Sequence, residues 1–269
     1  MKIGSQAHHG SAISTSSAAT IVVRGRDLTA DLMGSIGFTE HFWLLVTGAL
    51  PSATQRRVLD ATLVAIAEHG LVPSVQASRL TLAAAPEALQ GAVAAGILGC
   101  GSVILGAAEA AGRFLAEILQ RQDGGATAEA AVTAVVREYR AAGRAIPGYG
   151  HPLHKDHDPR ALRLFAIATE AGGAGRHIAL AQRIEELLPQ LVGKPLKLNV
   201  SGAIPAVLLD AGFPLAGLKG VPILARTASL IAHLVEEQQR PIGFVLSHAG
   251  AQAIDYDGAV PAGFRPGEQ

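Results

Sequence analysis

The stretch IPGYGHPLHKDHDPR, residues 146–160, lies between two long segments rich in alanine and leucine. Gly148 and Gly150 stand just ahead of a histidine, and such glycines allow a tight path that exposes backbone N–H and C=O groups. Asp158 and Pro159 form a start signal for a helix, because aspartate caps the first turn and proline fits the first helical position. The stretch therefore predicts a rigid polar loop that leads directly into a helix.

The rest of the sequence predicts helix almost throughout. Hydrophobic residues make up 49% of the 269 residues and aromatic residues only 4%, so the apolar part of the chain is mostly small and aliphatic, as in closely packed helices. The β-branched run TIVV at 20–23 is the exception and predicts a short strand or hairpin. The expected fold class is therefore all-α with a small N-terminal β element. The expected helices span about 39–48, 52–70, 75–85, 87–98, 103–121, 128–142, 159–171, 177–188, 201–211 and 222–238.

The helix expected over 52–70 has the clearest boundaries. Ser52 and Gln55 match a capping box, and Gly70 is a typical residue for a helix end. This assignment puts His69 in the last helical turn, where the carbonyl dipoles favour a protonated imidazole. The sequence therefore predicts a positively charged His69 at the end of this helix.

Composition argues against several classes of protein. Lysine plus arginine and aspartate plus glutamate number 22 each, so the net charge is zero and gives no footprint for nucleic acid or an anionic membrane. The uncharged stretch 88–108 is long enough to span a bilayer, but its five glycines indicate two core helices with a break between them. The single cysteine excludes an internal disulfide, and the N-terminus has no apolar run of signal-peptide length. We expect a cytoplasmic protein without membrane or nucleic-acid partners.

The loop carries side chains that suit acid–base chemistry on an anionic ligand. The imidazole of His151 can transfer a proton near neutral pH. Lys155 supplies a point charge for a phosphate, and Arg160 offers a fork of N–H groups for a carboxylate. A solvated linker between two helices is the alternative for such a loop. His151, His154 and His157 recur every three residues, but the metal reading is not favoured, and no metal site is expected.

The loop resembles the active-site loop of the citrate synthase superfamily, with the same spacing from His151 to Arg160. The N-terminal segment VVRGRDLTADL and the C-terminal segments LNVSGAIPAVLLDAGFP and ARTASLIAHLVEEQQRP resemble other parts of that family. The likeness therefore spans about 13–241. The chain length fits the short members, which are the citryl-CoA lyases and the lyase module of ATP-citrate lyase.

The resemblance implies a citrate synthase-like, two-domain helical fold and a homodimer. A large helical domain would comprise 1–105 and 201–269, and a small inserted domain would comprise 106–200, with the substrate in the cleft between them. The implied small-molecule partners are coenzyme A, as an acyl-CoA substrate, and a di- or tricarboxylate.

The family's site residues match named positions of this chain. Two histidines, His69 and His151, match those that contact the substrate hydroxyl or carbonyl and a carboxylate. Two arginines, Arg160 and Arg240, match those that bind substrate carboxylates. The resemblance also implies contacts to coenzyme A. The backbone of Gly148, Tyr149 and Gly150 would bind the adenine, and Lys155 would bind the phosphates.

Two positions depart from the family pattern. Ile104 and Leu105 stand where the family usually has a histidine that donates to the thioester oxygen, although lyase modules sometimes have an apolar residue there. Ser201 stands where the family has the aspartate that moves a proton at the acetyl α-carbon, and an alkyl hydroxyl is no base near pH 7 without help. Ser201 also fits the N-cap of a helix over 202–211.

The missing carboxylate favours cleavage over condensation. Condensation must remove a weakly acidic α-proton from acetyl-CoA, whereas cleavage begins with a hydroxyl proton, a step open to His151. The expected function is a coenzyme A thioester carbon–carbon lyase of the citryl-CoA lyase type. It would cleave citryl-CoA or a related 3-hydroxyacyl-CoA to acetyl-CoA and a keto acid such as oxaloacetate, with His151, His69 and Ser201 as catalytic residues. The alternatives are a citrate synthase-type acyl transferase and a homologue that binds coenzyme A thioesters without catalysis.

Overall fold

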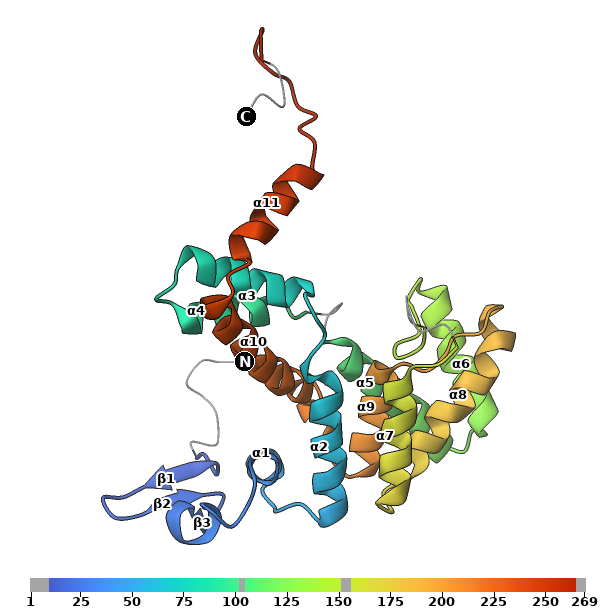
Figure 1. The fold of residues 1–269 in the computed structure, drawn as a ribbon. Helices are drawn as coiled ribbons and strands as arrows, with labels where there is room; N and C mark the ends of the chain where they lie inside the picture. The colour runs from blue at the N-terminus through green and yellow to red at the C-terminus, as the bar shows by residue number, and fades with distance from the viewer. Residues whose placement is uncertain (1–9, 102–104, 151–155, 265–269) are drawn as a thin grey trace. The chain divides into compact units, whose positions relative to one another are not determined.

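The computed structural model describes residues 10–101, 105–150 and 156–264 (Figure 1). His151 and Lys155, two residues expected in the site, lie outside this part of the chain. The described backbone forms helices after a small N-terminal sheet. The predicted all-α class with a small β element is therefore confirmed.

The chain divides into two compact units by its internal contacts. The first unit comprises Met1–Glu68 and Cys100–Arg226, and the second comprises His69–Gly99 and Thr227–Gln269. Helix α10 (Gly220–Gln239) begins in the first unit and ends in the second. The division into a large domain and a small inserted domain, which the resemblance implies, stays a prediction.

The N-terminal sheet is a three-stranded antiparallel meander. β1 (Ser14–Ser16) pairs with β2 (Ile21–Val23), and β2 pairs with β3 (Arg26–Asp27). Positive φ angles at Arg24, 49°, and Gly25, 79°, close the turn between β2 and β3. The β-branched run of the sequence thus forms the central strand.

The first unit is built around a buried helix, α9. Its elements after the sheet are η1 (Leu28–Leu32), α1 (Phe38–Thr47), α2 (Ala53–Ala67), α5 (Ala107–Asp123), α6 (Ala128–Ala141), α7 (Pro159–Glu170), α8 (Arg176–Val192), α9 (Val200–Asp210) and η2 (Leu215–Gly217). α9 is apolar on all sides, and its Ile204, Val207 and Leu208 are at most 1% exposed. α5, α7 and α8 pack against α9, and α2 packs against α7 and α9 (Figure 1). The candidate site residues of α7 and α9 are therefore held by the core of this unit.

The second unit contains α3 (Pro73–Ala84), α4 (Leu89–Leu98), the C-terminal part of α10, and α11 (Gly243–Ala253). α3 packs against both α4 and α11. α4 approaches α10 closely because Gly96 has no side chain, and a Cβ there would lie 2.7 Å from Leu230 Cδ1.

The uncharged stretch 88–108 contains α4 and the start of α5 with a break between them, as the sequence predicts. In the described part of the chain, one segment, Leu215–Gln239, is long and apolar enough to cross a membrane by length and composition alone. Of its most apolar window, 39% is buried. Core helices of folded domains pass the same criterion, and Glu236 and Glu237 lie near the end of this segment.

Helix α2 ends earlier than its sequence predicts. The last helical residue is Ala67, because Glu68 is extended, with φ −107° and ψ 141°. The chain then turns at Gly70, φ 70°, and the next helix begins at Pro73. His69 is exposed and lies beyond the helix, so the prediction that it occupies the last helical turn is wrong.

Candidate active site

The glycine loop, residues 148–150, is hydrogen-bonded to the segment that leads into α9. Gly150 N donates to Lys197 O at 2.7 Å, and Asn199 N donates to Gly148 O at 3.0 Å. Asn199 Nδ2 adds a bond of 2.6 Å to Gly150 O, across 49 positions of sequence. The described part of the loop is therefore tied to the first unit, unlike a solvated linker.

Gly148 and Gly202 touch through backbone atoms. The φ angles of Gly148 and Gly150 are 85° and 87°, a region that glycine adopts readily. A Cβ on Gly148 would lie 2.6 Å from Gly202 Cα, and a Cβ on Gly202 would lie 2.6 Å from Gly148 O. Because neither position has room for a side chain, the loop backbone lies directly on the first turn of α9.

Tyr149 anchors the loop in the core. It is 8% exposed, and its hydroxyl donates to the carbonyl of Ala181 on α8 at 2.8 Å. Burial, and then the negative charge of Glu185, raise the pKa of the Tyr149 hydroxyl well above its ordinary value. The side chain of Tyr149 thus has a structural role. The coenzyme A contacts expected of Gly148, Tyr149 and Gly150 concern their backbone and stay a prediction.

Ser201 lies in the first turn of α9 and is half-buried. Asn199 is the N-cap of this helix, because its Oδ1 accepts the N–H groups of Ser201 at 2.9 Å and Gly202 at 3.2 Å. The interpretation of Ser201 as the N-cap is therefore wrong, because the helix already begins at Val200. Sequence reasoning missed Asn199, although an asparagine just before a helix is itself a capping signal.

Asp158 and Arg160 form an ion pair at the start of α7. Asp158 is 1% exposed, and its Oδ1 caps α7 by accepting the Arg160 N–H at 3.1 Å, as the sequence predicts. The same carboxylate accepts Arg160 Nε at 3.0 Å and Nη2 at 2.9 Å. Its Oδ2 also accepts the N–H of Val200 at 2.9 Å, which ties α7 to α9. Burial alone would raise the pKa of Asp158, but the hydrogen bonds from Arg160 and Val200 outweigh it and lower that pKa.

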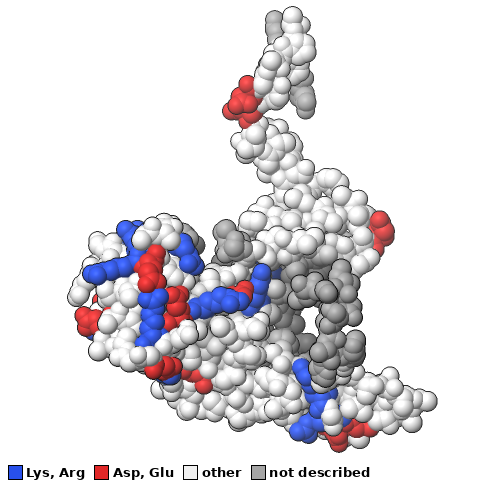
Figure 2. Space-filling model, turned by 180° about the vertical axis from the view of Figure 1, so that it is seen from behind, with Lys and Arg blue, Asp and Glu red and all other residues white. Residues whose placement is uncertain are grey.

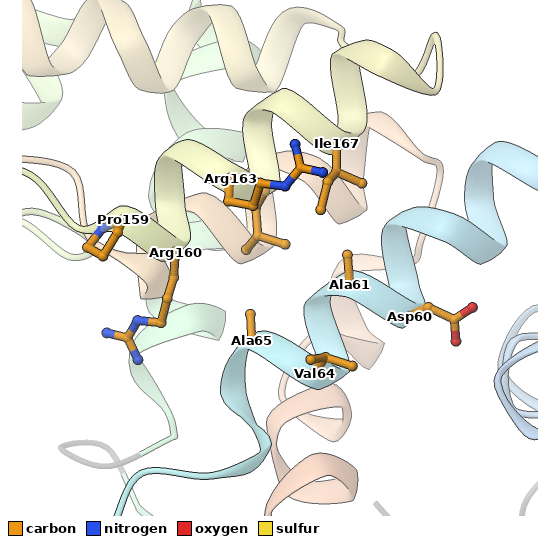
Figure 3. Close-up of a pocket in the computed structure, with 9 residues that line it drawn as sticks. Asp60, Ala61, Val64, Ala65, Pro159, Arg160, Arg163 and Ile167 are labelled. Atoms are coloured by element: carbon orange, nitrogen blue, oxygen red, sulfur yellow. The ribbon is translucent and has the colours of Figure 1, made fainter.

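A groove of about 480 Å³ opens between α2 and α7 and reaches Arg160 (Figure 3). Its charged lining residues are Asp60, Arg160 and Arg163. A volume of this size is typical of small-molecule sites. The other lining residues are aliphatic: Ala61, Val64, Ala65, Pro159, Leu164 and Ile167.

His69 and Arg240 belong to the second unit, whereas the glycine loop, Arg160 and Ser201 belong to the first. Arg240 follows the end of α10, its side chain is 81% exposed, and its Nη1 lies 4.0 Å from Glu236 Oε1. The substrate contacts expected of His69 and Arg240 stay predictions.

Arg226 is a candidate that sequence reasoning missed. It lies on α10 in the first unit and is 2% exposed. In the part of the chain that the structure describes, its Nε and Nη1 are buried and meet no acceptor. A buried guanidinium is costly without an anionic partner, so Arg226 is a candidate carboxylate ligand. The only sequence signal is an arginine within the apolar segment ILARTASLI.

Metal ligands do not gather in the described residues. Among them, no group of three histidine, cysteine, aspartate or glutamate side chains could hold a metal ion. His157 is described and exposed, but His151 and His154 lie outside the described residues. The expected absence of a metal stays a prediction.

Basic and acidic side chains lie next to one another on the face shown in Figure 2. Ion pairs of the first unit include Arg121 with Glu138 at 2.7 Å and Arg183 with Glu186 at 2.8 Å. Such pairing agrees with the zero net charge of the sequence, because each pair places a positive charge beside a negative one.

Acid should destabilise the protein through Asp210 at the end of α9. Its carboxylate accepts the N–H of His177 at 2.9 Å and that of Ile178 at 3.0 Å, and also contacts the His177 ring. Burial would raise the pKa of Asp210, but the hydrogen bonds from His177 and Ile178 outweigh it and lower that pKa. Since the folded pKa is lowered, this stabilisation is present above about pH 4 and is lost as pH falls through the folded value.

Urea unfolding of Asp210→Asn at a series of pH values checks this prediction. We expect the variant to be less stable than wild type by roughly 2 kcal/mol at pH 7 and to converge with wild type as the pH falls through the lowered pKa of folded Asp210. An equal difference in the free energy of unfolding at pH 7 and at low pH would contradict it.

The chain matches known proteins over nearly its whole length. Residues 11–243 match the family described as citrate synthase, C-terminal domain. The solved citryl-CoA lyase from Hydrogenobacter thermophilus is 33% identical with a TM-score of 0.83, over 96% of this chain and 97% of that chain. ATP citrate lyase from Methanothrix soehngenii, solved with citrate and coenzyme A, is 24% identical with a TM-score of 0.76, over 96% of this chain and 42% of that chain. This second likeness concerns the fold alone.

A curated relative is the citrate/2-methylcitrate synthase of Bacillus subtilis, which is 27% identical over 213 residues. The match covers 76% of this chain and 53% of that protein, so this chain spans about half the length of that relative. The match over residues 11–243 and the 33% identity to a citryl-CoA lyase lead to one family. The chain belongs to the citrate synthase family.

Proposed function

We propose that this protein is a carbon–carbon lyase that cleaves citryl-CoA, or a related 3-hydroxyacyl-CoA, to acetyl-CoA and a keto acid such as oxaloacetate. The main structural support is the set of hydrogen bonds between the glycine loop, α7 and α9. In this set, Asp158 binds both Arg160 and the backbone of Val200, in the helix turn that contains Ser201. The match to citryl-CoA lyase over 97% of that chain supports the same reaction.

The reaction needs a base for the substrate hydroxyl and an acid for the departing carbon. His151, next in sequence after the loop, takes the hydroxyl proton, and the alkoxide electrons form the ketone while the carbon–carbon bond breaks. The electron pair of that bond passes to the acetyl carbon and gives the enolate of acetyl-CoA. A proton from His151, or from a water held by Ser201, completes acetyl-CoA. No step removes a proton from carbon, so the carboxylate that Ser201 replaces is not required as a base.

Arginines and the loop would hold the substrate. The proposed carboxylate ligands in the first unit are Arg160 and Arg226. The guanidinium of Arg160 is paired with Asp158, and that of Arg226 is buried. The loop backbone and Lys155 would bind the adenine and phosphates of coenzyme A. His69 and Arg240 complete the proposed set of residues.

Purified protein incubated with citryl-CoA tests the proposal, with oxaloacetate followed through a coupled malate dehydrogenase. We expect oxaloacetate and acetyl-CoA in equal amounts, and a rate that falls with Arg160→Ala. Acyl-CoA binding by calorimetry with no product above a protein-free control would overturn the lyase and favour a non-catalytic binder.

A citrate synthase is the second candidate, since a relative carries the name citrate/2-methylcitrate synthase. Ser201→Asp would restore a carboxylate in the first turn of α9, where the helix dipole favours the ionised form. We expect this variant to release coenzyme A thiol from acetyl-CoA plus oxaloacetate about 10²-fold faster than wild type. Ser201→Asn, similar in size but without charge, is the control. Equal rates for the Asp and Asn variants would contradict the role of position 201.

We propose further that the chain forms a homodimer. Four large apolar residues from the start of α11 onward are more than 60% exposed: Phe244, Val245, Ile254 and Tyr256. Several large exposed apolar side chains within one segment of the chain favour a protein partner. Light scattering should give twice the 27.6 kDa chain mass, and Phe244→Asp should shift it toward monomer, while Met33→Asp, at another exposed apolar residue, should not. A monomeric wild type would contradict the homodimer.

A further inference from the structure

Asp158 makes more contacts than a helix cap requires. Capping α7 needs one acceptor for the N–H of Arg160, which serine or asparagine would also supply. The carboxylate of Asp158 instead accepts four bonds: the N–H, Nε and Nη2 of Arg160, and the N–H of Val200. A carboxylate accepts about four hydrogen bonds, so its capacity is filled. Asparagine in its place would put an amide donor against Nη2 and the N–H of Val200.

The four contacts relate two helices that carry predicted substrate ligands. Oδ1 accepts a hydrogen bond from Nε of Arg160, and Oδ2 accepts one from Nη2. These two parallel bonds fix the plane of the guanidinium. Oδ2 also holds Val200, the first residue of α9, 42 positions away in sequence. Asn199, directly before Val200, binds the carbonyl of Gly150. One connected set of hydrogen bonds therefore links Arg160, the first turn of α9 and the glycine loop.

We propose that Asp158 is a positioning residue of the lyase site, a role that rests on the proposed function. It holds the Arg160 guanidinium in a fixed position relative to the first turn of α9, so that a carboxylate bound to Arg160 lies in a fixed position relative to Ser201. Asp158 is 1% exposed and acts through Arg160 rather than by touching substrate. A misplacement of about 1 Å at such a site can cost ~10²-fold in rate.

Asp158→Asn in the full-length protein tests the proposal, and Asp210→Asn is its matched control. Asp210 is also buried, caps α8 through Gly175 and Ile178, and contacts His177, all apart from the proposed site residues. Both variants should lose stability in urea. Only Asp158→Asn should lose about 10²-fold in kcat/KM for citryl-CoA and weaken citrate binding in calorimetry by a similar factor.

Two further variants keep the test decisive. Asp158→Ser retains a helix cap and removes the grip on Arg160, so it should show the same kinetic loss even if Asp158→Asn fails to fold. In an Arg160→Ala background, Asp158→Asn should reduce kcat/KM by less than about threefold more, because its effect runs through Arg160.

The outcomes separate this inference from the proposed function. If wild type cleaves citryl-CoA while Asp158→Asn or Asp158→Ser stays within about threefold of Asp210→Asn in kcat/KM, the positioning role is overturned and the lyase stands. If wild type neither cleaves citryl-CoA nor binds citrate, both are overturned.

Discussion

Gly148→Ala is expected to lower the free energy of unfolding by about 2–5 kcal/mol, with two costs that add. Alanine at a φ of 85° is strained by about 1–2 kcal/mol, and its Cβ would lie 2.6 Å from Gly202 Cα, an overlap of the kind that costs about 1–3 kcal/mol. Urea unfolding measures the loss. Gly143→Ala is the matched control, because its φ is 67° and a Cβ there meets nothing within 4 Å. Only the strain of about 1–2 kcal/mol is expected for the control.

Gly202→Ala isolates the contact from the strain. Gly202 is helical, and alanine is favoured over glycine inside a helix by about 1 kcal/mol. Any loss must therefore come from the overlap with Gly148 O at 2.6 Å and Leu198 Cδ1 at 2.7 Å. If both Gly148→Ala and Gly202→Ala are as mild as the Gly143 control, the loop does not rest on α9.

His151→Ala is expected to slow citryl-CoA cleavage by ~10²–10⁴-fold, because the substrate hydroxyl loses its general base. Stability and acyl-CoA binding should change little, since the proposed role of His151 is proton transfer. Cleavage is followed as oxaloacetate release, and binding by calorimetry.

His41→Ala is the control for this prediction, because His41 lies on α1, outside both the proposed site residues and the proposed dimer residues. A His151→Ala variant that keeps the wild-type rate would remove the imidazole from the mechanism. A variant that loses acyl-CoA binding together with the rate would assign His151 to binding instead.

Local sequence signals predicted the starts of α2 and α7 correctly. Ser52 and Gln55 form the expected capping box, with Gln55 Oε1 accepting the N–H of Ser52 at 2.8 Å. Asp158 and Pro159 begin α7 as expected. These signals work because a cap is made within four residues of sequence.

The end of α2 and the long-range contacts could not be predicted in this way. Helix α2 ends early because Glu68 is extended and leads toward the next helix. The glycine at position 70 therefore predicted the helix end too late, and His69 was wrongly placed in the last turn. The bond between Asp158 and Val200 joins residues 42 positions apart, and no local pattern marks it. The burial of Arg226 also depends on packing rather than on its neighbours in sequence. The residue types of the candidate site could be predicted from the loop and its resemblance, but the bonds that join Asp158 to Arg160 and Val200 could be found only in the structure.

A crystal structure of the protein with coenzyme A and citrate would show directly where both ligands bind. We expect the adenine against the backbone of residues 148–150 and a citrate carboxylate about 3 Å from the Arg160 guanidinium, with the bonds between Asp158 and Arg160 intact. Citrate bound away from Arg160, with the coenzyme away from the glycine loop, would contradict this expectation.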